Sequence, residues 1–273
     1  MNNEKISIIM GIFNCAETLP DAIDSILNQT YDNWELIMCD DCSTDDTYNV
    51  AKSYQERYPE KIILIRNDVN SRLAYSLNHC LKYATGKYVA RMDGDDISVA
   101  DRFEKQIKFL KENPHVDLVG TSMRRFNDKG MHDIVYGAKN PDRYTLRNAT
   151  PFCHATIMTY KSVYDKLGGY TVAERTKRAQ DYDLWFKFYY HGFNGQNLTE
   201  PLYMVREDEN AVRRRTAKVR INAYKTTLYG FRLLKYPVWW LIQPTVRLLI
   251  RLITPYFVVD LYREFQYKKN KNL

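Results

Sequence analysis

A run of acidic residues, Asp93-Gly-Asp95-Asp96, directly follows a short apolar stretch of the chain. Carboxylates this close repel one another unless a cation joins them, and Gly94 permits the tight backbone curvature that brings them together. Mg²⁺ and Mn²⁺ take oxygen ligands of this kind and share them with substrate phosphates. The run therefore predicts a divalent-cation site, with capping of a helix that begins near Val99 as the alternative.

A second acidic run, Asp40-Asp41-Cys-Ser-Thr-Asp45, follows another apolar stretch. Ionised carboxylates accept hydrogen bonds and do not donate them, so this run suits the N–H groups of a base or the hydroxyls of a ribose. Capping of the next helix by Ser43, Thr44 or Asp45 is the alternative, and both roles can hold at different residues. Further polar side chains occupy equivalent places in the chain, namely Asn14, Glu17, Asn67 and Asp68.

Each of these polar places follows a predicted strand. In the first 120 residues, short β-branched runs alternate with longer amphipathic segments, which is the pattern of a parallel sheet covered by helices on both faces. The expected strands are Ile6–Ile12, Glu35–Cys39, Ile62–Arg66, Tyr88–Met92 and Val116–Thr121, and the expected helices are Leu19–Asn28, Asp46–Tyr58, Leu73–Tyr83 and Ala100–Glu112. Open α/β sheets bind ligands at the carboxyl ends of their strands. We therefore expect the acidic residues to line one crevice.

Two common nucleotide-binding motifs do not follow these strands. The sequence has neither GxGxxG after the first strand nor GxxxxGK[ST], which argues against a dinucleotide fold and a P-loop enzyme. Beyond residue 120, glycines and prolines mark turns before a second ordered block from Phe152 to Val205. Within it we expect a strand at Thr156–Tyr160 and helices at Lys161–Leu167 and Asp181–His191. We expect this block to build the acceptor half.

Composition and charge narrow the class of protein. The chain has 273 residues, 45% hydrophobic and 27% charged, which excludes disordered and collagen-like proteins. Its five scattered cysteines disfavour a secreted disulfide framework and favour a reducing cytosol. Residues 1–205 hold 25 Lys/Arg against 28 Asp/Glu, whereas residues 206–273 hold 15 against 5. Nucleic-acid binding is the weakest interpretation, because these basic residues lie among Trp, Leu and Ile rather than in a reader motif.

The basic tail has the pattern of a helix that lies in a membrane surface. Two adjacent tryptophans precede an apolar stretch from Leu248 to Val259, with Arg247 and Arg251 one turn apart. No window reaches 18 uncharged apolar residues, which disfavours a transmembrane helix. Amphipathic segments of this kind bind anionic lipid, and packing on the catalytic domain or a partner subunit is the alternative. Additional basic residues follow, namely Lys268, Lys269 and Lys271.

Four motifs occur in an order that resembles a known family. They are Ser7-Ile-Ile-Met-Gly-Ile-Phe-Asn14 with Glu17, Asp40-Asp41-Cys-Ser-Thr-Asp45, Ala90-Arg-Met-Asp93-Gly-Asp95-Asp96 and Gln180-Asp181-Tyr-Asp-Leu-Trp185. Over roughly residues 5–205 they resemble the family 2 glycosyltransferases, and within that family bacterial enzymes that assemble capsular, O-antigen or exopolysaccharide units. The resemblance implies an α/β GT-A fold, which is a Rossmann-like, mostly parallel open sheet with helices on both faces. A C-terminal amphipathic helical tail would follow it.

The resemblance also implies roles for individual residues in an inverting transfer from a nucleoside-diphosphate sugar, expected to be a UDP-sugar. The donor-binding residues would be Phe13, Asn14, Glu17, Asp40, Asp41, Arg72 and Asp93. Mn²⁺ or Mg²⁺ would be bound by Asp95 and His154. Asp181 matches the family's general base, and Gln180 stands where Glu is usual, which removes one acceptor-orienting charge. The acceptor would contact Gln180, Tyr170 and Trp185, with core packing the alternative for Trp185 and a structural role for His154.

The working hypothesis is a metal-dependent, inverting glycosyltransferase that acts on a lipid-linked saccharide at the cytoplasmic face of the cell membrane. Such a transfer needs one carboxylate base and one cation for the leaving diphosphate. Residues 1–120 would bind the nucleotide sugar, residues 121–210 the acceptor, and residues 211–273 the membrane. Arg213-Arg214-Arg215 would either pair with a diphosphate or be a solvated run. The alternative function is a catalytically inactive sugar-nucleotide-binding or scaffold subunit, which Gln180 suggests.

Overall fold

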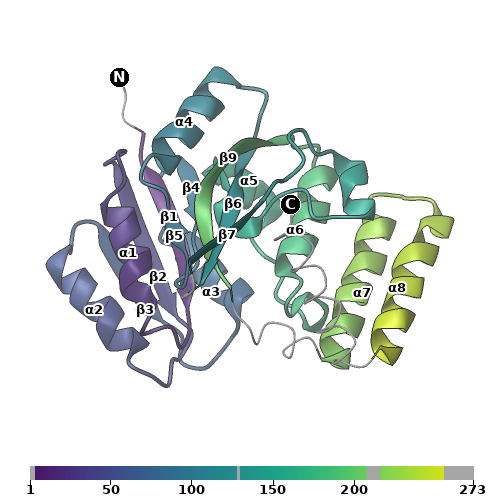
Figure 1. Ribbon diagram of the computed structural model, residues 1–273, viewed down its shortest axis with the longest axis horizontal. Coiled ribbons are helices and arrows are strands. Elements are labelled where there is room, and N and C mark those ends of the chain that lie inside the picture. Colours follow the sequence, from purple (N-terminus) through teal and green to yellow (C-terminus); the bar gives the residue numbers. More distant parts are fainter. Residues whose placement is uncertain (1–3, 128–129, 208–215, 255–273) are drawn as a thin grey trace. The chain divides into compact units, whose positions relative to one another are not determined.

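The computed structural model describes residues 4–127, 130–207 and 216–254 (Figure 1). The chain forms two compact units, of which the first comprises Met1–Val172 and Gln180–Glu207. The second comprises Ala173–Ala179 and Asp208–Leu273, so a short internal segment belongs with the C-terminal helices. The arginine run at residues 213–215 and the lysines at residues 268, 269 and 271 lie outside the described residues.

Four parallel strands form the N-terminal half of the sheet. In spatial order they are β3 (Ile62–Arg66), β2 (Trp34–Asp40), β1 (Ile6–Ile12) and β4 (Tyr88–Arg91), and the connecting helices are α1 (Leu19–Leu27), α2 (Thr47–Arg57) and α3 (Leu73–Leu81). Six of the seven residues of β1 are buried, which explains its mostly apolar sequence, and the buried Ser7 hydroxyl donates to Glu35 Oε1 at 2.6 Å. Gly11 lets α3 pack close, because a Cβ there would lie 2.8 Å from Leu73 Cδ1. The loops that carry the acidic runs therefore lie at the carboxyl ends of these parallel strands, as expected.

The sheet becomes mixed beyond β4. It continues through β8, β6, β9 and β5, and β7 pairs with the later part of β6. The β4–β8, β8–β6 and β9–β5 pairs are antiparallel, whereas β6–β9 is parallel. The bounds of these elements and their helices are β5 (Ile97–Ser98), α4 (Arg102–Glu112), β6 (Leu118–Asn127), β7 (Gly130–Val135), β8 (Met158–Tyr160), α5 (Lys161–Leu167), α6 (Gln180–Tyr190) and β9 (Gly195–Arg206). The first unit is therefore an α/β domain built on one mixed sheet.

A buried arginine on α4 fixes the end of β4. Arg102 Nη2 donates hydrogen bonds to the carbonyl oxygens of Arg91 at 3.0 Å and Ala155 at 3.3 Å. Its Nε donates to Gln106 Oε1 at 3.0 Å, and Gln106 Nε2 donates to the carbonyl oxygen of Thr156 at 2.8 Å. Hydrogen bonds from a charged group are stronger than neutral ones, and strongest away from water. The strand end that carries the acidic run is consequently held in place.

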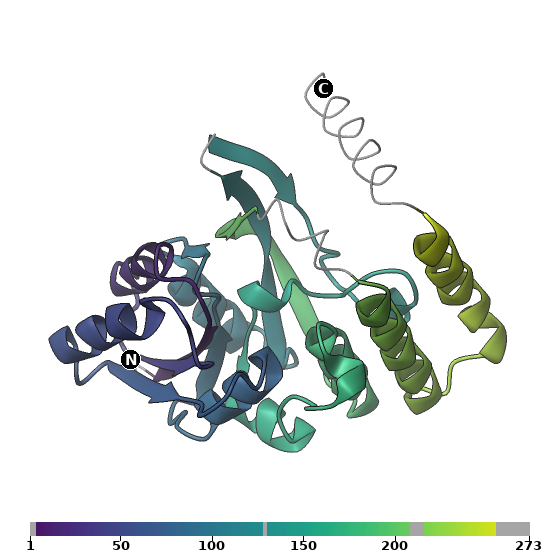
Figure 2. The same ribbon diagram turned by 90° about the horizontal axis from the view of Figure 1, so that it is seen from below.

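The second unit is helical. The 3₁₀ turn Glu174–Thr176 (η3) contacts α7 (Ala217–Leu233), where Thr226 Oγ1 donates to the carbonyl oxygen of Arg175 at 2.6 Å. Figure 2 shows α7 beside α8 (Ile242–Ile253), and Tyr224 Oη lies 2.6 Å from Thr245 Oγ1 between them. Within the described residues, no helix combines the length and hydropathy needed to cross a bilayer. The tail thus contains a helix pair in its described part.

Candidate active site

The acidic run after β4 folds into a compact carboxylate cluster. Asp93, Asp95 and Asp96 each contribute one oxygen, and these oxygens lie within 4.8 Å of one another. Gly94 lets Cys15 pack closely against this turn, because a Cβ there would lie 3.0 Å from Cys15 Sγ. Oxygen atoms are the donors that Mg²⁺ and Mn²⁺ prefer, so the cluster fits such an ion.

The cluster does not cap the following helix. α4 begins at Arg102 with Asp101 as its N-cap, and β5 lies between this helix and the acidic run. Asp96 instead accepts a hydrogen bond from the backbone N–H of Arg206 at 2.8 Å. The capping alternative for Asp95 and Asp96 is therefore wrong, and the contact with Arg206 joins the cluster to the end of β9.

Arg91, the last residue of β4, is the buried counter-ion of this cluster. Its guanidinium contacts both carboxylate oxygens of Asp93 through Nη1 and Nη2, and its side chain is only 4% exposed. Tyr203 Oη accepts a hydrogen bond from the Asp93 backbone N–H at 3.1 Å. The sequence interpretation assigned no role to Arg91, although a charged residue at the end of an otherwise apolar buried strand is unusual. Its place two residues before Asp93, on the same side of the chain, was the available signal.

The carboxylates of the cluster repel one another. Burial and the charges of Asp93 and Asp95 raise the pKa of Asp96 well above its ordinary value. Loss of water and the charge of Asp93 also raise the pKa of Asp95, while Arg91 and Arg206 oppose that rise. A divalent cation would favour the ionised forms, because opposite charge stabilises them.

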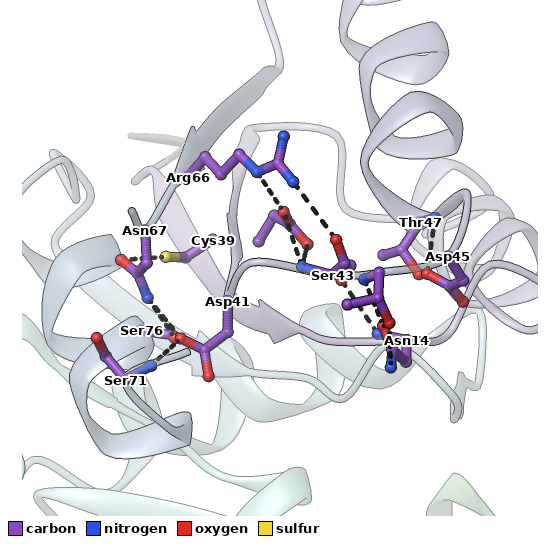
Figure 3. Close-up of polar contacts among 12 residues, drawn as sticks. Asn14, Cys39, Asp41, Ser43, Asp45, Thr47, Arg66, Asn67, Ser71 and Ser76 are labelled. Carbon is purple, nitrogen blue, oxygen red and sulfur yellow. Dashed lines mark hydrogen bonds and ion pairs between the residues drawn. The ribbon is translucent and has the colours of Figure 1, made fainter. Parts of the chain in front are cut away.

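A different arrangement holds the end of β2 (Figure 3). Asp41 Oδ1 accepts hydrogen bonds from Asn67 Nδ2 at 2.9 Å and from the Ser71 backbone N–H at 2.7 Å. Asp41 Oδ2 accepts one from the Arg72 backbone N–H at 2.8 Å. Arg72 has a backbone φ of 75°, which residues other than glycine rarely adopt. Asp41 therefore also restrains a residue with a strained backbone. The Asp41 carboxylate therefore holds the loop before α3.

Asp40 is equally well supported. It is fully buried, accepts a hydrogen bond from the Ser43 backbone N–H at 3.2 Å and pairs with Arg66 Nε at 3.0 Å. Asn14 joins this loop to the end of β1, because its Oδ1 accepts from the Thr44 backbone N–H at 2.9 Å (Figure 3). Backbone and side-chain groups of the protein thus supply partners for the carboxylates of Asp40 and Asp41.

Other expected donor contacts surround this loop. Phe13 is 45% exposed, and Glu17 is also exposed. The N-cap of α2 is Asp46, with no side-chain cap hydrogen bond, so the expected capping by Ser43, Thr44 or Asp45 is wrong. Asp45 Oδ1 nevertheless accepts from the backbone N–H of Thr47, the first residue of α2, at 3.0 Å. Direct contact of these residues with the donor stays a prediction. The residues concerned are Phe13, Asn14, Glu17, Asp40, Asp41, Arg72 and Asp93.

Asp181, the predicted base, lies in the first turn of α6 next to Gln180. Burial raises the pKa of the Asp181 carboxyl, and the charge of Asp93 raises it further, whereas Arg91 lowers it. A raised pKa suits a general base, because it moves the proton affinity of the carboxylate toward neutral pH.

The remaining predicted site residues form a buried aromatic group. His154 Nε2 lies 2.8 Å from Tyr170 Oη, and burial with the nearby Arg91 charge lowers the His154 pKa well below its ordinary value. Trp185 is fully buried, with its ring 5.1 Å from that of Phe152. These contacts match the packing alternative for Trp185. The group of side chains that could hold a metal comprises Asp93, Asp95 and Asp96 and does not include His154. A metal-binding role for His154 stays a prediction. Acceptor roles for Tyr170 and Trp185 also stay predictions.

Comparison with known sequences supplies a family for this site. The family described as "Glycosyl transferase family 2" matches residues 7–168. The chain is 46% identical over 260 residues to EpsE of Bacillus subtilis (strain 168), covering 95% of this chain and 93% of EpsE. It is also 29% identical to the Escherichia coli UDP-Glc:alpha-D-GlcNAc-diphosphoundecaprenol beta-1,3-glucosyltransferase WfaP, covering 74% of this chain and 78% of WfaP.

Solved structures share the fold at low sequence identity. S. aureus TarS 1–349 in complex with UDP-GlcNAc matches with a TM-score of 0.66 at 18% identity, over 82% of this chain but only 66% of that one. The mannosyltransferase PcManGT from Pyrobaculum calidifontis, in complex with GDP-Man and Mn²⁺, matches with a TM-score of 0.65 at 17% identity, over 97% of this chain and 80% of that one. The GT-A fold predicted from the sequence is confirmed.

Proposed function

The chain belongs to glycosyltransferase family 2, and from this premise we propose that it transfers a sugar from a nucleoside-diphosphate sugar to a lipid-linked saccharide, with inversion and a divalent metal. A role in polysaccharide synthesis and a UDP-sugar donor are supported by WfaP, whose name specifies UDP-Glc and a diphosphoundecaprenol acceptor. The UDP-GlcNAc complex of TarS supports the same nucleotide, whereas the GDP-Man complex of PcManGT makes guanine the alternative base.

The carboxylate cluster is the observation that carries this proposal. Asp95 is its exposed member and would ligate the metal, with Asp93 and Asp96 beside it. A Mg²⁺ or Mn²⁺ ion bound there would neutralise the charge that develops on the leaving diphosphate. The loop that Asp41 holds, at the end of β2, would receive the nucleoside; β1 lies between β2 and β4 in the sheet.

Asp181 would act as the general base. Its carboxylate takes the proton from the acceptor hydroxyl, whose oxygen then forms a bond to the anomeric carbon. The bond from that carbon to the diphosphate breaks, and its electron pair leaves with the diphosphate. Since the acceptor attacks the sugar face opposite the diphosphate, the configuration inverts without a covalent enzyme intermediate.

Release of nucleoside diphosphate tests the proposal. We expect turnover of a nucleotide sugar with Mn²⁺ and its loss after chelation. Substitution of Asp181→Asn should lower transfer by roughly 10²- to 10⁴-fold, the usual worth of general base catalysis, while donor affinity stays near wild type. Failure of every UDP- and GDP-sugar to turn over would instead support the inactive binding subunit.

The described part of the second unit supports a membrane-surface site. Along α8, Ile242, Val246, Leu249, Ile250 and Ile253 recur at helical spacing and are 46–80% exposed. The described residues of this unit carry ten Lys/Arg but a single acidic residue, Glu174. An exposed apolar stripe within such a basic surface suits anionic lipid. We therefore assign the enzyme to the cytoplasmic face of the cell membrane as part of the proposal.

Vesicle flotation tests this assignment. The wild-type protein should float with vesicles containing phosphatidylglycerol and less with neutral ones. Substitution of Ile250→Asp should release it. Met131→Asp is the matched control, because Met131 is as exposed as Ile250 but lies on β7 of the first unit. Equal flotation of the Ile250 variant and the wild type would exclude α8 as the lipid contact.

A further inference from the structure

The guanidinium of Arg91 forms a bidentate ion pair with the carboxylate of Asp93. Its two terminal nitrogens contact the two oxygens of Asp93, which is the paired geometry that binds carboxylates most strongly. Its third nitrogen, Nε, is buried without a hydrogen-bond partner among the residues that the structure describes. Burying an unpaired donor is unfavourable, so the pairing with Asp93 determines the orientation of Arg91.

The other arginine near the cluster has different contacts. The guanidinium of Arg206 donates to Asp21 Oδ2 at 3.0 Å and to the backbone carbonyl of Asp95 at 3.2 Å. Its backbone N–H, which carries no formal charge, is the group that bonds to Asp96. Among the residues that the structure describes, Arg91 is thus a cation whose side chain pairs with a carboxylate of the cluster.

We propose that Arg91 competes with a divalent cation for Asp93, so that the cluster binds the cation tightly only together with a diphosphate. This inference rests on the proposed function and adds an order of binding to it. The paired contact with Arg91 uses one lone pair on each Asp93 oxygen and so leaves fewer for a metal, and the positive guanidinium repels a second cation nearby. The phosphate oxygens of a bound donor would supply the ligands and the negative charge that Arg91 removes.

Binding of Mn²⁺, followed by electron paramagnetic resonance, tests this competition without any turnover. The wild-type protein should bind Mn²⁺ weakly alone and at least about tenfold more tightly with UDP or inorganic diphosphate, since each brings several negative charges close to the ion. Arg91→Gln should bind Mn²⁺ alone roughly tenfold more tightly than the wild type, because it removes a unit charge a few ångströms away. The gain that UDP produces should shrink in that variant.

Two further variants make the result specific. Arg91→Lys keeps the charge but loses the paired geometry, so its affinity for Mn²⁺ alone should fall between those of the wild type and Arg91→Gln. Arg66→Gln is the matched control, because it also breaks an arginine–aspartate pair, at the β2 end. Its affinity for Mn²⁺ alone should equal that of the wild type.

Arg91→Gln should remain folded, because the side chain of Asp93 is 29% exposed and water can replace the lost guanidinium. Thermal melting checks this point, and Arg91→Lys carries the test if Arg91→Gln unfolds. Unchanged or weaker binding of Mn²⁺ alone by the folded Arg91 variants would overturn the inference. A wild-type protein that still transfers sugar would then leave the proposed function intact.

Discussion

The ends of β2 and β4 both carry adjacent acidic residues, but the carboxylates at the two ends have different interaction partners. At the β2 end, Asp40 and Asp41 are buried and receive hydrogen bonds from backbone N–H groups, with Arg66 as an ion-pair partner. At the β4 end, three carboxylates face one another, and one arginine, Arg91, pairs with Asp93. The first arrangement stabilises loops, whereas the second retains repulsion that a ligand can relieve.

This difference distinguishes acidic residues that stabilise the fold from acidic residues that can bind a cation. Similar acidic motifs in the sequence give no means of telling the two apart, since both follow apolar strands. The partners decide: a carboxylate whose oxygens are already hydrogen-bonded contributes to the fold, and one that faces like charges is available to a cation. Substitutions at the two ends should accordingly separate activity from stability.

The largest effect should come from Asp95→Asn. Loss of the exposed cluster carboxylate should lower kcat by about a thousandfold, corresponding to the several kcal/mol that metal stabilisation of a leaving group provides. The melting temperature should stay constant or rise, because a like charge is removed. Turnover with Mn²⁺ and a thermal melt on the same sample check both expectations. A variant that melts earlier but keeps its kcat would reverse the comparison.

Asp41→Asn should clearly lower stability, which Asp95→Asn should not. An amide has one acceptor oxygen in place of two, so one of the three donors from Asn67, Ser71 and Arg72 loses its partner. We expect a loss of about 1–3 kcal/mol in the free energy of unfolding, measured by urea denaturation. Asp68→Asn, at an exposed neighbouring position, is the control and should change this free energy little. Unchanged stability of the Asp41 variant would remove the loop-holding role.

A smaller effect should appear in the pH dependence of kcat/KM. The base must be ionised, and the pKa of Asp181 is raised by burial and by Asp93, which belongs to the β4 cluster. Activity should therefore be present above the raised pKa and fall as the pH decreases through it, at a higher pH than for an ordinary aspartate. The residual activity of Asp181→Asn should lack this acid limb. An acid limb that persists in the variant would assign it to another group.

Much of the donor half could be predicted from the sequence. β1 and β3 have the expected bounds because both are short, mostly apolar runs rich in isoleucine. β9 (Gly195–Arg206) was not expected, since Pro201 interrupts it and its pairing with β6 shifts register beside that proline. Its partner lies more than 70 residues earlier in the chain, and local periodicity carries no information about such a pairing.

For the candidate site, the sequence predicted the acidic residues but not their contacts. The acidic runs were visible because carboxylates after apolar strands are distinctive. The burial of Asp41 and the pairing of Arg91 with Asp93 depend on contacts with other segments or on the path of the backbone. The packing of Tyr170 and Trp185 among aromatic rings likewise depends on how α6 meets its neighbours. Spacing alone could name these residues but not their contacts.

The central claim is that the β4 cluster holds a divalent cation together with the donor diphosphate. Anomalous diffraction from a crystal grown with Mn²⁺ and UDP tests it most directly. The account predicts a manganese peak within ligand distance, about 2.0–2.3 Å, of an Asp95 oxygen, with diphosphate oxygens completing the coordination. A manganese peak at another site, or UDP bound at the β2 end with no metal at Asp95, would contradict it.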